Sequence, residues 1–427
     1  MAPRAPNHVL IVGAGAAGLM AARDLARGGK RVTVLEARDR CGGRIWTLPE
    51  EEFGYRAEAG PEFVHGAAPV TRAVMREAGL SIQRRGGTRW SKRSRILRPD
   101  DAPMPYARQF YEALVAVKAD LPVADFLERH FSDPRYDGLR QSVTRTVEGY
   151  DAADPNRMST FALREEWMAR DDGEHGRIAE SYGALIDHLA ADARRLGATI
   201  QFGAVVDSIE ENSGGIAALC RDGARCEADA AILAVPLPFF TEIALPAAAS
   251  ERAAAAADIG FGNVVKLLLR FRARWWAGDG EHDLSDLSFV ISNAAVPTWW
   301  TQHPAEHPVL TGWYAGPKAD RVSALGEAEL VAMGIASLAE IFELPAERLR
   351  ASLITARAIN WGNDPFARGA YSYVTPQTKA ALRLLKRTDA VPIFFSGEAL
   401  YEGPDMGTVE AALASGQETA RIILRLR

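Results

Sequence analysis

The residues best placed to do chemistry stand near the start of the chain, where three glycines are spaced as Gly13, Gly15 and Gly18. They follow the apolar run 8–12 and open a helix-forming stretch, after which a second β-rich run ends at Glu36. This strand–turn–helix–strand context makes the pattern a dinucleotide-binding fingerprint. We expect Gly13 to permit a tight turn, Gly15 to admit a pyrophosphate and Gly18 to allow close helix–strand packing. Glu36 is placed to accept hydrogen bonds from a ribose, and its charge disfavours NADP.

The segment after Glu36 separates nicotinamide from flavin dinucleotides. It contains Arg38 and, a few residues later, a Gly-Gly-Arg turn made by Gly42, Gly43 and Arg44. The two glycines allow a close backbone approach, and the arginine offers a fork of hydrogen-bond donors. This segment resembles the extended motif of the flavin-containing amine oxidase family. The resemblance implies that Arg38, Gly43 and Arg44 lie along the diphosphate of FAD.

A second segment strengthens this resemblance and supplies residues for both cofactor and substrate. Gly60, Pro61 and Glu62 match the family segment that passes under the isoalloxazine ring, and Phe63 and His65 follow directly. A histidine at this place resembles the polyamine-oxidase branch, where it lies near the substrate amine. A single histidine is also common as a structural residue, so both roles stay open for His65.

The last part of the chain contains a third matching motif. A β-rich run ends at Gly397 and Glu398, and Thr408 and Val409 begin a helix expected to run to about residue 424. The resemblance implies that Glu398 contacts the ribityl–phosphate region of FAD and that the helix N-terminus faces the flavin pyrimidine edge. A helix N-terminus carries roughly half a positive charge, which favours the negative charge of reduced flavin.

Lys266 is the strongest candidate for a catalytic side chain. It interrupts the apolar run 264–271, and a lysine is costly to bury unless its ammonium group is solvated or paired. The alternative is that its head group snorkels to solvent. Resemblance to the family implies that Lys266 holds a water molecule next to flavin N5.

Aromatic residues in the second half of the chain predict a substrate cage. Trp361 and Tyr371 resemble the family residues that cover the flavin and form one wall of the cage, and Tyr373 is a nearby alternative. Aromatic faces attract amines that carry positive charge. Six of the nine tryptophans lie between Trp275 and Trp361, which suits an aromatic-walled pocket, although core packing explains each one taken singly. We place Tyr371 with Lys266 and His65 as catalytic residues.

The resemblance implies a reaction as well as a fold. In this family an uncharged amine transfers a hydride from its α-carbon to N5, the imine is hydrolysed to a carbonyl, and O2 is reduced to H2O2. Monoamine oxidases carry a flavin-linked cysteine where this chain has Ala370, so we predict noncovalent FAD. Thr408 replaces the second cage tyrosine and joins Phe63, His65, Tyr371 and Tyr373 in the predicted substrate pocket. Thr408 and His65 are more typical of the polyamine-oxidase and histone-demethylase branch.

Two other readings stay open. The same fold accommodates an L-amino-acid oxidase or a desaturase, and an amino-acid oxidase needs a cation for the substrate carboxylate, for which Arg145, Arg157 and Arg357 are candidates. A different class is a non-catalytic flavin-binding or assembly protein, against which Lys266 and Tyr371 argue. A second dinucleotide site is not expected, because the pair Gly260 and Gly262 lacks a third glycine.

These motifs need two interleaved domains to position them. We predict an α/β fold in which a Rossmann-like FAD-binding domain alternates with a mixed-sheet and helical substrate domain. In the family, a valine at the position of Val206 meets the adenine through its backbone. The FAD-binding domain is expected at residues 1–82, 178–245 and 389–427, and the substrate domain at residues 83–177 and 246–388.

Length and composition agree with a soluble enzyme. The chain has 427 residues, 48% of them hydrophobic and 25% charged, with a net charge of −5, so it lacks the basic surplus of nucleic-acid-binding proteins. No apolar run predicts a signal peptide or membrane helix, and no coiled-coil insertion is present. The three cysteines fit no metal site, and Cys220 and Cys226, which flank a turn, are expected to be free thiols more often than paired ones. We expect a cytoplasmic protein whose partners are a small amine and O2. We expect it to bind neither nucleic acid nor a membrane, and a homo-oligomer is one possible assembly.

Overall fold

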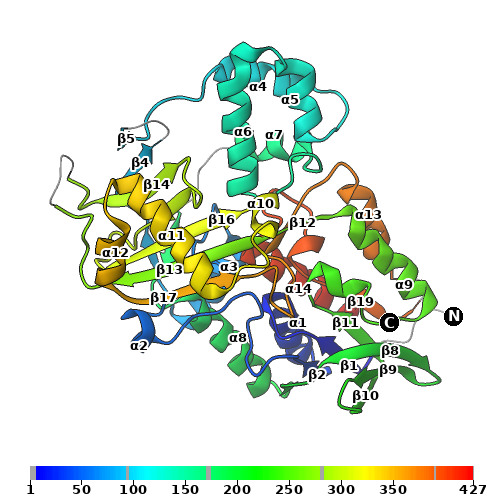
Figure 1. The fold of residues 1–427 in the computed structure, drawn as a ribbon. Coiled ribbons are helices and arrows are strands. Elements are labelled where there is room, and N and C mark those ends of the chain that lie inside the picture. Colours follow the sequence, from blue (N-terminus) through cyan, green and yellow to red (C-terminus); the bar gives the residue numbers. More distant parts are fainter. Residues whose placement is uncertain (1–5, 93–95, 170–174, 279–282, 389–390, 427) are drawn as a thin grey trace.

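The computed structural model describes residues 6–92, 96–169, 175–278, 283–388 and 391–426. The first five residues and the predicted domain boundary near residue 389 lie outside the described residues. Within them, helices and strands follow one another along the chain, and the two largest sheets, of five and seven strands, lie in different parts of the molecule (Figure 1).

The first sheet is built from three distant parts of the chain. Its five strands are all parallel and short, and all except the edge strand at residues 199–201 are largely apolar and buried, as expected when both faces of a sheet are covered. In spatial order they are β19 (Ile393–Phe395), β11 (Ala230–Leu233), β1 (His8–Val12), β2 (Arg31–Leu35) and β7 (Thr199–Gln201). The beginning, middle and end of the chain therefore meet in one sheet.

Alternate residues of these strands face two different layers, because side chains point to opposite faces of a strand. Val9 and Ile11 pack with four helices, whereas Leu10 and Val12 pack with a three-stranded sheet and two further helices. The helices of the first layer are α1 (Ala16–Arg27), α3 (Pro69–Ala78), α8 (Tyr182–Arg195) and α14 (Val409–Arg425). The second layer contains β8 (Val206–Asn212), β9 (Gly215–Cys220), β10 (Arg225–Ala228), α9 (Ala247–Ala254) and α13 (Thr378–Leu385). This is a Rossmann-like arrangement, as predicted.

The second sheet has seven strands of mixed direction. Two helices, α11 (Glu327–Phe342) and α12 (Ala346–Ser352), cover one face, where Val265, Leu267 and Leu269 are buried. In spatial order the strands are β17 (Leu353–Asn360), β13 (Val264–Phe271), β16 (Val309–Ala315), β15 (Thr298–Trp300), β14 (Leu287–Ser292), β4 (Thr88–Lys92) and β5 (Arg98–Pro99). The alternation along β13 turns Lys266 to the face opposite these helices.

A group of four helices rises beyond the end of this sheet (Figure 1). It has its own apolar cluster, with Phe110, Phe126 and Leu139 completely buried. Its helices are α4 (Ala107–Ala116), α5 (Val123–Phe131), α6 (Asp137–Gly149) and α7 (Thr160–Met168). The remaining elements are two strand pairs, β3 (Ile82–Arg84) with β6 (Gly176–Ile178) and β12 (Gly260–Gly262) with β18 (Tyr371–Tyr373), the helices α2 (Glu50–Phe53) and α10 (Pro317–Asp320), and 3-10 turns at 134–136, 237–240, 255–258 and 398–400.

The structure corrects one expectation of the sequence reading. Residues 88–92 form strand β4 of the seven-stranded sheet, within the segment 83–177, whose sequence pattern predicts mostly helices. The Asp-Gly pair at residues 222 and 223 predicts a hairpin turn, and β9 and β10 form this hairpin. Cys226 pairs with Ala218, so Cys220 and Cys226 do not face each other, and both are free thiols as expected. The numerical domain boundaries stay a prediction.

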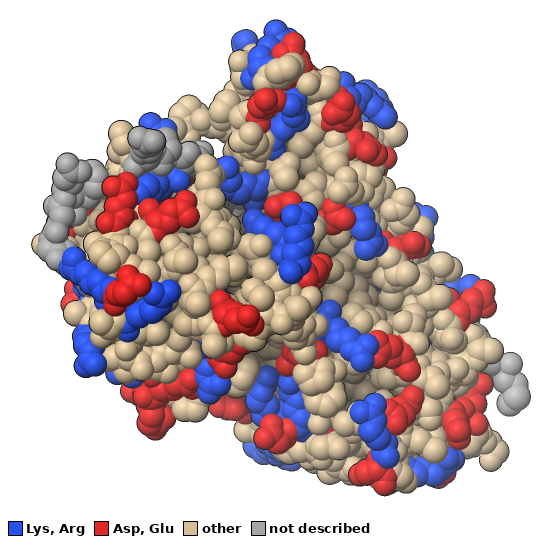
Figure 2. All heavy atoms as spheres, viewed as in Figure 1, with Lys and Arg blue, Asp and Glu red and all other residues tan. Residues whose placement is uncertain are grey.

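The surface in Figure 2 shows lysine and arginine interspersed with aspartate and glutamate over the visible face. Among the described residues, no helix combines the length and apolar character needed to cross a membrane.

Candidate active site

One large cavity runs between the two sheets and the helical group. Its volume is about 2130 Å³, well above the roughly 300–1,000 Å³ of ordinary small-molecule pockets, so it has room for a dinucleotide and a substrate together. Of the predicted site residues, Gly18 alone does not border it. Those that do are Gly13, Gly15, Glu36, Arg38, Gly43, Arg44, Gly60, Pro61, Glu62, Phe63, His65, Val206, Lys266, Trp361, Tyr371, Tyr373, Gly397, Glu398, Thr408 and Val409.

The glycine turn between β1 and α1 has the geometry of a phosphate cradle. Gly13 has a φ of 105°, which favours glycine, and a Cβ at Gly18 would lie 2.0 Å from the carbonyl oxygen of Gly13. Gly15 begins α1 without a side-chain cap, so the N–H groups of the first turn remain available at the cavity. An anion at this helix N-terminus is favoured by the free donors and the helix dipole.

Glu36 closes the same cradle at the end of β2. Its carboxylate accepts hydrogen bonds from the backbone N–H groups of Ala14, at 2.7 Å, and Arg38, at 2.9 Å. Burial raises the pKa of Glu36, and these hydrogen bonds partly offset the rise. Arg38 forms an ion pair with Asp364 at 2.5 Å and lies over the ring of Phe366. Both side chains are therefore held in place at the cavity wall.

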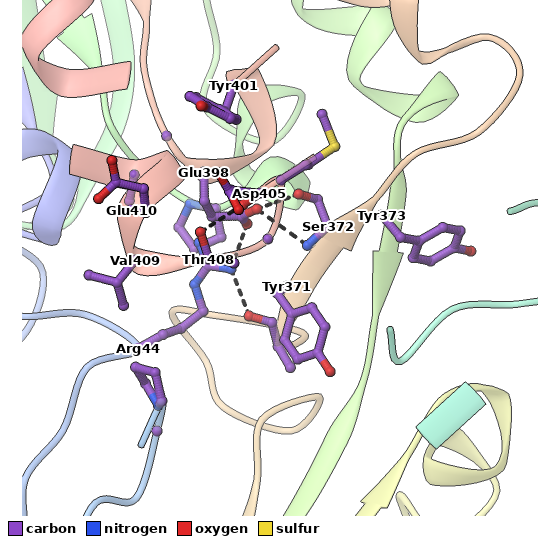
Figure 3. Close-up of a pocket in the computed structure, with 18 of the residues that line it drawn as sticks. Arg44, Tyr371, Ser372, Tyr373, Glu398, Tyr401, Asp405, Thr408, Val409 and Glu410 are labelled. Carbon is purple, nitrogen blue, oxygen red and sulfur yellow. Dashed lines mark hydrogen bonds and ion pairs between the residues drawn. The ribbon is translucent and has the colours of Figure 1, made fainter. Parts of the chain in front are cut away.

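The Gly-Gly-Arg turn and the C-terminal motif meet through an ion pair. Arg44 donates to Glu398 at 2.8 Å and to the carbonyl of Ala370 at 2.7 Å, and Ser372 also donates to the Glu398 carboxylate. Figure 3 shows Glu398 between Ser372 and Thr408. The Thr408 hydroxyl accepts from Ala411 N–H and so caps α14. These contacts connect three motifs far apart in sequence.

The backbone around Gly60 fits tightly under the same region. A Cβ at Gly60 would lie 1.9 Å from the carbonyl oxygen of Arg44, and the Trp361 indole donates to the carbonyl of Ala59 at 3.2 Å. Val206 is buried at the start of β8 and borders the same cavity. The predicted ring-side and adenine-side residues therefore lie along one continuous cavity.

Lys266 is completely buried and paired, so the snorkelling alternative is wrong. Its Nζ donates to Glu62 Oε2 and to the carbonyl of Gly60, each at 3.0 Å. Glu62 also accepts from Arg177 at 2.8 Å and from the indole of Trp300. Burial raises the pKa of Glu62, but the charges and hydrogen bonds of Lys266 and Arg177 outweigh burial and lower it to about 2.

The aromatic residues divide between the cavity and the core. Trp300, Trp313 and Trp361 border the cavity, whereas Trp275, Trp276 and Trp299 pack under α11 and α12. The aromatic-walled pocket is therefore made by some members of the tryptophan cluster. The doublet of residues 299 and 300 is split between the two faces of β15, as side-chain alternation requires.

Tyr371 and Tyr373 both border the cavity but differ in their contacts. Tyr371 stacks near Trp313, with 6.4 Å between ring centroids, and its hydroxyl donates to the carbonyl of Tyr150 at 2.6 Å. Tyr373 packs in the apolar cluster of the four helices and points away from Glu398 and Thr408 in Figure 3. Tyr371 is therefore the better placed of the two to meet a substrate.

His65 lies among aromatic rings at the cavity. Its ring centroid is 6.1 Å from that of Phe63, 5.9 Å from that of Tyr150 and 5.5 Å from that of His175. Since Tyr150 also accepts from Tyr371, the structure brings His65 and Tyr371 to the same part of the cavity.

A pair of carboxyl groups in this part of the cavity escaped the sequence reading. Asp151 follows α6, and Glu166 lies in α7; both border the cavity. The Asp151 and Glu166 side chains are hydrogen-bonded to each other, and no N–H or O–H donor of the described residues reaches the buried Oδ2 atom of Asp151. Burial raises the pKa of Asp151, and the charge of Glu166 raises it further; burial also raises the pKa of Glu166. No motif marks these residues, because α6 and α7 come together only in the fold.

Comparison with known proteins now decides the family. A family model described as flavin containing amine oxidoreductase matches residues 16–424. The chain belongs to this family. The family binds FAD, and the glycine turn, Glu36 and the Arg44–Glu398 pair offer the donors and the space that this dinucleotide requires.

Curated relatives of this amine oxidoreductase are similar over nearly its whole length. It is 26% identical over 450 residues to polyamine oxidase 2 of Arabidopsis thaliana, covering 97% of this chain and 87% of the relative. It is also 26% identical over 450 residues to lysine-specific histone demethylase 2 of Homo sapiens, covering 97% of this chain and 53% of the relative. The chain thus spans about half the length of the demethylase.

Solved structures show the same fold. Wild-type putrescine oxidase bound to putrescine has a TM-score of 0.77 and 22% identity, with 98% of this chain and 99% of that chain covered. The FAD-dependent amine oxidase fold predicted from the motifs is therefore confirmed.

Proposed function

We propose that this amine oxidoreductase oxidises a diamine or polyamine, using noncovalently bound FAD and O2. The observation that carries the proposal is the continuity of one cavity. It joins the phosphate cradle of α1 to Lys266, Tyr371 and the carboxyl pair of Asp151 and Glu166. Cofactor and substrate can therefore meet in one enclosed space.

At the cofactor end of the cavity, each segment is assigned to one part of FAD. The first turn of α1 receives the diphosphate, Glu36 the ribose, Val206 the adenine and Glu398 the ribityl region. The N-terminus of α14, at Thr408 and Val409, faces the flavin pyrimidine edge. Ala370 has no group that can bond covalently to a flavin, which supports noncovalent binding. The bound flavin supplies the two-electron oxidant.

The substrate end suits a molecule with two amino groups. The Asp151 and Glu166 carboxyl groups attract an ammonium group, and the buried Asp151 Oδ2, which no described donor reaches, can accept its hydrogen bond. The aromatic faces of Tyr371 and Trp313 border the same cavity and suit the alkyl part of the substrate. The second amino group is uncharged, and the carbon that bears it loses the hydride.

The roles of the remaining residues follow from this orientation. Lys266 holds a water molecule at the reacting end, and His65 and Phe63 border the amine. The imine product takes up water and gives a carbonyl compound and the released amine, and O2 accepts two electrons and two protons to form H2O2. Burial of the site strengthens the electrostatic interactions that orient the amine.

A second candidate is an L-amino-acid oxidase. Of the three arginines considered for a substrate carboxylate, Arg145 borders the cavity. Arg157 donates to the carbonyl of Ala257, and Arg357 pairs with Glu52, and neither borders the cavity. The negative charge of the carboxyl pair would repel the carboxylate of an amino acid, so the pair favours a diamine over an amino acid as substrate. A desaturase or a non-catalytic flavoprotein has no corresponding observation in its favour.

The test compares substrates of matched length under anaerobic conditions. Putrescine, spermidine, butylamine and L-amino acids are mixed with the FAD-loaded protein, and the flavin absorbance is followed. We expect putrescine or spermidine to bleach the flavin at lower concentrations than butylamine, and peroxide to form when air is admitted. Faster bleaching by amino acids would support the second candidate, and no bleaching by any amine would contradict amine oxidation.

A further inference from the structure

The Glu62 carboxylate is the centre of a buried polar cluster beside the cavity. It accepts hydrogen bonds from four side chains: Lys266 Nζ at 3.0 Å, Arg177 Nε at 2.8 Å, Trp300 Nε1 at 3.0 Å and Gln302 Nε2 at 3.1 Å. A carboxylate has about four lone-pair sites, so its acceptor capacity is used by the protein. This carboxylate therefore acts on the site through its neighbours.

The donors fix the carboxylate from several sides. Arg177 belongs to β6 and also donates to the carbonyls of Thr301, at 2.9 Å, and His303, at 3.3 Å, while its guanidinium lies 4.5 Å from the ring centroid of Phe63. Trp300 belongs to β15 and borders the cavity itself. The position of Glu62 is thus determined by contacts that do not involve Lys266.

Lys266 has little freedom of its own. Its ammonium group has three N–H donors, of which one goes to Glu62 and one to the carbonyl of Gly60. Its side chain is 1% exposed and borders the cavity. Because Glu62 and the Gly60 carbonyl use two of the three donors, the third N–H remains for the cavity, where the reaction is proposed to take place.

We propose that Glu62 is a positioning residue, which holds the Lys266 ammonium group so that its remaining N–H serves the reacting end of the cavity. This inference rests on the proposed function for the role of Lys266. Arg177, Trp300 and Gln302 support the same geometry by holding Glu62. A lysine that served only in packing would not need an ion pair that fixes its ammonium group at the edge of the cavity.

The experiment compares Glu62→Gln, Glu62→Asp and Lys266→Met with the double variant Glu62→Gln/Lys266→Met, all in the FAD-loaded protein. We expect Glu62→Gln to slow anaerobic flavin reduction at saturating amine by about 10- to 100-fold, because a displaced group near the reaction costs about that much. KM should change little. In the Lys266→Met background, Glu62→Gln should change the rate less than twofold, since both act through one ammonium group.

A second readout needs no amine. Dye-coupled photoreduction measures the flavin midpoint potential, which the charge of Lys266 raises by favouring reduced flavin. If Glu62 positions Lys266, the potential falls in Glu62→Gln and in Lys266→Met, and falls no further in the double variant. If Glu62 acts only as a negative charge, its removal raises the potential, which would overturn the proposal.

Two further variants serve as controls. One tests the proposal even if Glu62→Gln does not fold, and the other tests whether loss of any buried glutamate has the same effect. Glu62→Asp keeps the charge but draws the carboxylate back, so we expect a slower rate and a lower potential even where Glu62→Gln does not fold. Glu58→Gln is the matched control: Glu58 is buried four residues away, accepts from Thr47 and Tyr182, and does not border the cavity.

The Glu58→Gln control must be measured at a pH where Glu58 is mostly protonated, so that the substitution does not also remove a negative charge. The titratable groups around Lys266 are Glu62, Arg177, Glu58 and Tyr55. Burial raises the pKa of Glu58 to about 7, so at pH 6 it is mostly protonated and glutamine imitates it closely. At that pH Glu58→Gln should leave the rate and the potential unchanged. Equal effects of Glu58→Gln and Glu62→Gln would reject a specific role for Glu62.

The outcome separates the two proposals. If wild-type flavin is reduced by no amine, the proposed function fails, while the midpoint potentials still test the positioning of Lys266. If wild-type flavin is reduced and Glu62→Gln has an unchanged rate and potential, the positioning role fails and the amine oxidase function stands.

Discussion

Asp151 places a buried carboxyl oxygen at the cavity wall, and no N–H or O–H donor of the described residues reaches this oxygen. Charge-assisted hydrogen bonds contribute about 1.5–3 kcal/mol, so loss of this acceptor should weaken diamine binding by about 10- to 100-fold. We therefore expect Asp151→Asn to raise KM for putrescine by that factor and to leave kcat/KM for butylamine nearly unchanged. Steady-state kinetics with both amines measure this. Glu347→Gln, at an exposed position on α12, is the control, and an equal loss with butylamine would contradict the assignment.

The same pair predicts a pH dependence of diamine binding. Burial raises the pKa of Asp151 and of Glu166, so the pair keeps a proton at a pH where exposed carboxyl groups are ionised. Raising the pH removes this proton and strengthens attraction to an ammonium group. KM for putrescine should therefore fall as pH rises through this ionisation, until the amine itself loses its proton. In a double variant, Asp151→Asn/Glu166→Gln, that fall should disappear; its persistence would assign the ionisation to another group.

Most of the residues that the motifs single out border the cavity, but the motifs do not record how these residues interact. Lys266 stands out because a cation interrupts an apolar strand, and its burial is confirmed. Glu62 was predicted as a cofactor residue, yet its carboxylate is occupied by Arg177, Trp300 and Gln302, which follow it by more than 100 residues. Such contacts depend on how β6 and β15 approach the Glu62 segment. No local pattern records that approach.

The contact between α1 and the glycine turn is specific enough to test. A methyl group at Gly18 would lie 2.0 Å from the Gly13 carbonyl oxygen and 3.3 Å from the Ala234 methyl group. We expect Gly18→Ala to push α1 away from β1, to destabilise the protein by about 1–3 kcal/mol and to lower the bound FAD content. Thermal unfolding and the flavin-to-protein absorbance ratio measure the two effects.

Gly138→Ala provides the control within a helix. Gly138 lies in the first turn of α6, with the nearest atom to its added Cβ at 3.8 Å on Pro105. Alanine is favoured over glycine in such an open helical position, by about 0.4–1 kcal/mol. This variant should keep its flavin and be as stable as the wild type or more stable. Full FAD content in Gly18→Ala would show that α1 tolerates the shift.

Elements with a strong local pattern were predicted well. Val264–Phe271 forms β13 with the predicted bounds, and the helix expected from Thr408 onward is α14, Val409–Arg425. Strand β4 was missed because Thr88–Lys92 is short and polar. It becomes a strand by parallel pairing with β14, about 200 residues later, and this pairing is invisible in a local window.

Interleaving of distant segments was predicted from the order of the motifs. The five-stranded sheet joins β1 and β2 to β7, β11 and β19, so strands from the beginning, middle and end of the chain lie side by side. Sequence alone did not predict that one cavity reaches from this sheet to the four helices. That property depends on the placement of whole layers, because the lining residues come from several of them.

This construction predicts that FAD stabilises the entire molecule. FAD would contact segments near residues 13, 44, 206, 370 and 398, all of which border the same cavity, so it should bind the folded state and not the unfolded chain. Free FAD at about 100 times its Kd then adds roughly 2.7 kcal/mol to the free energy of unfolding. Removal of FAD should lower Tm, and added FAD should restore it as the logarithm of its concentration rises. An unchanged Tm would show that the segments hold together without FAD.

The same site predicts noncovalent binding of the cofactor. Because Ala370 offers no covalent link, acid precipitation should release the flavin into the supernatant. Flavin retained in the pellet would contradict noncovalent binding.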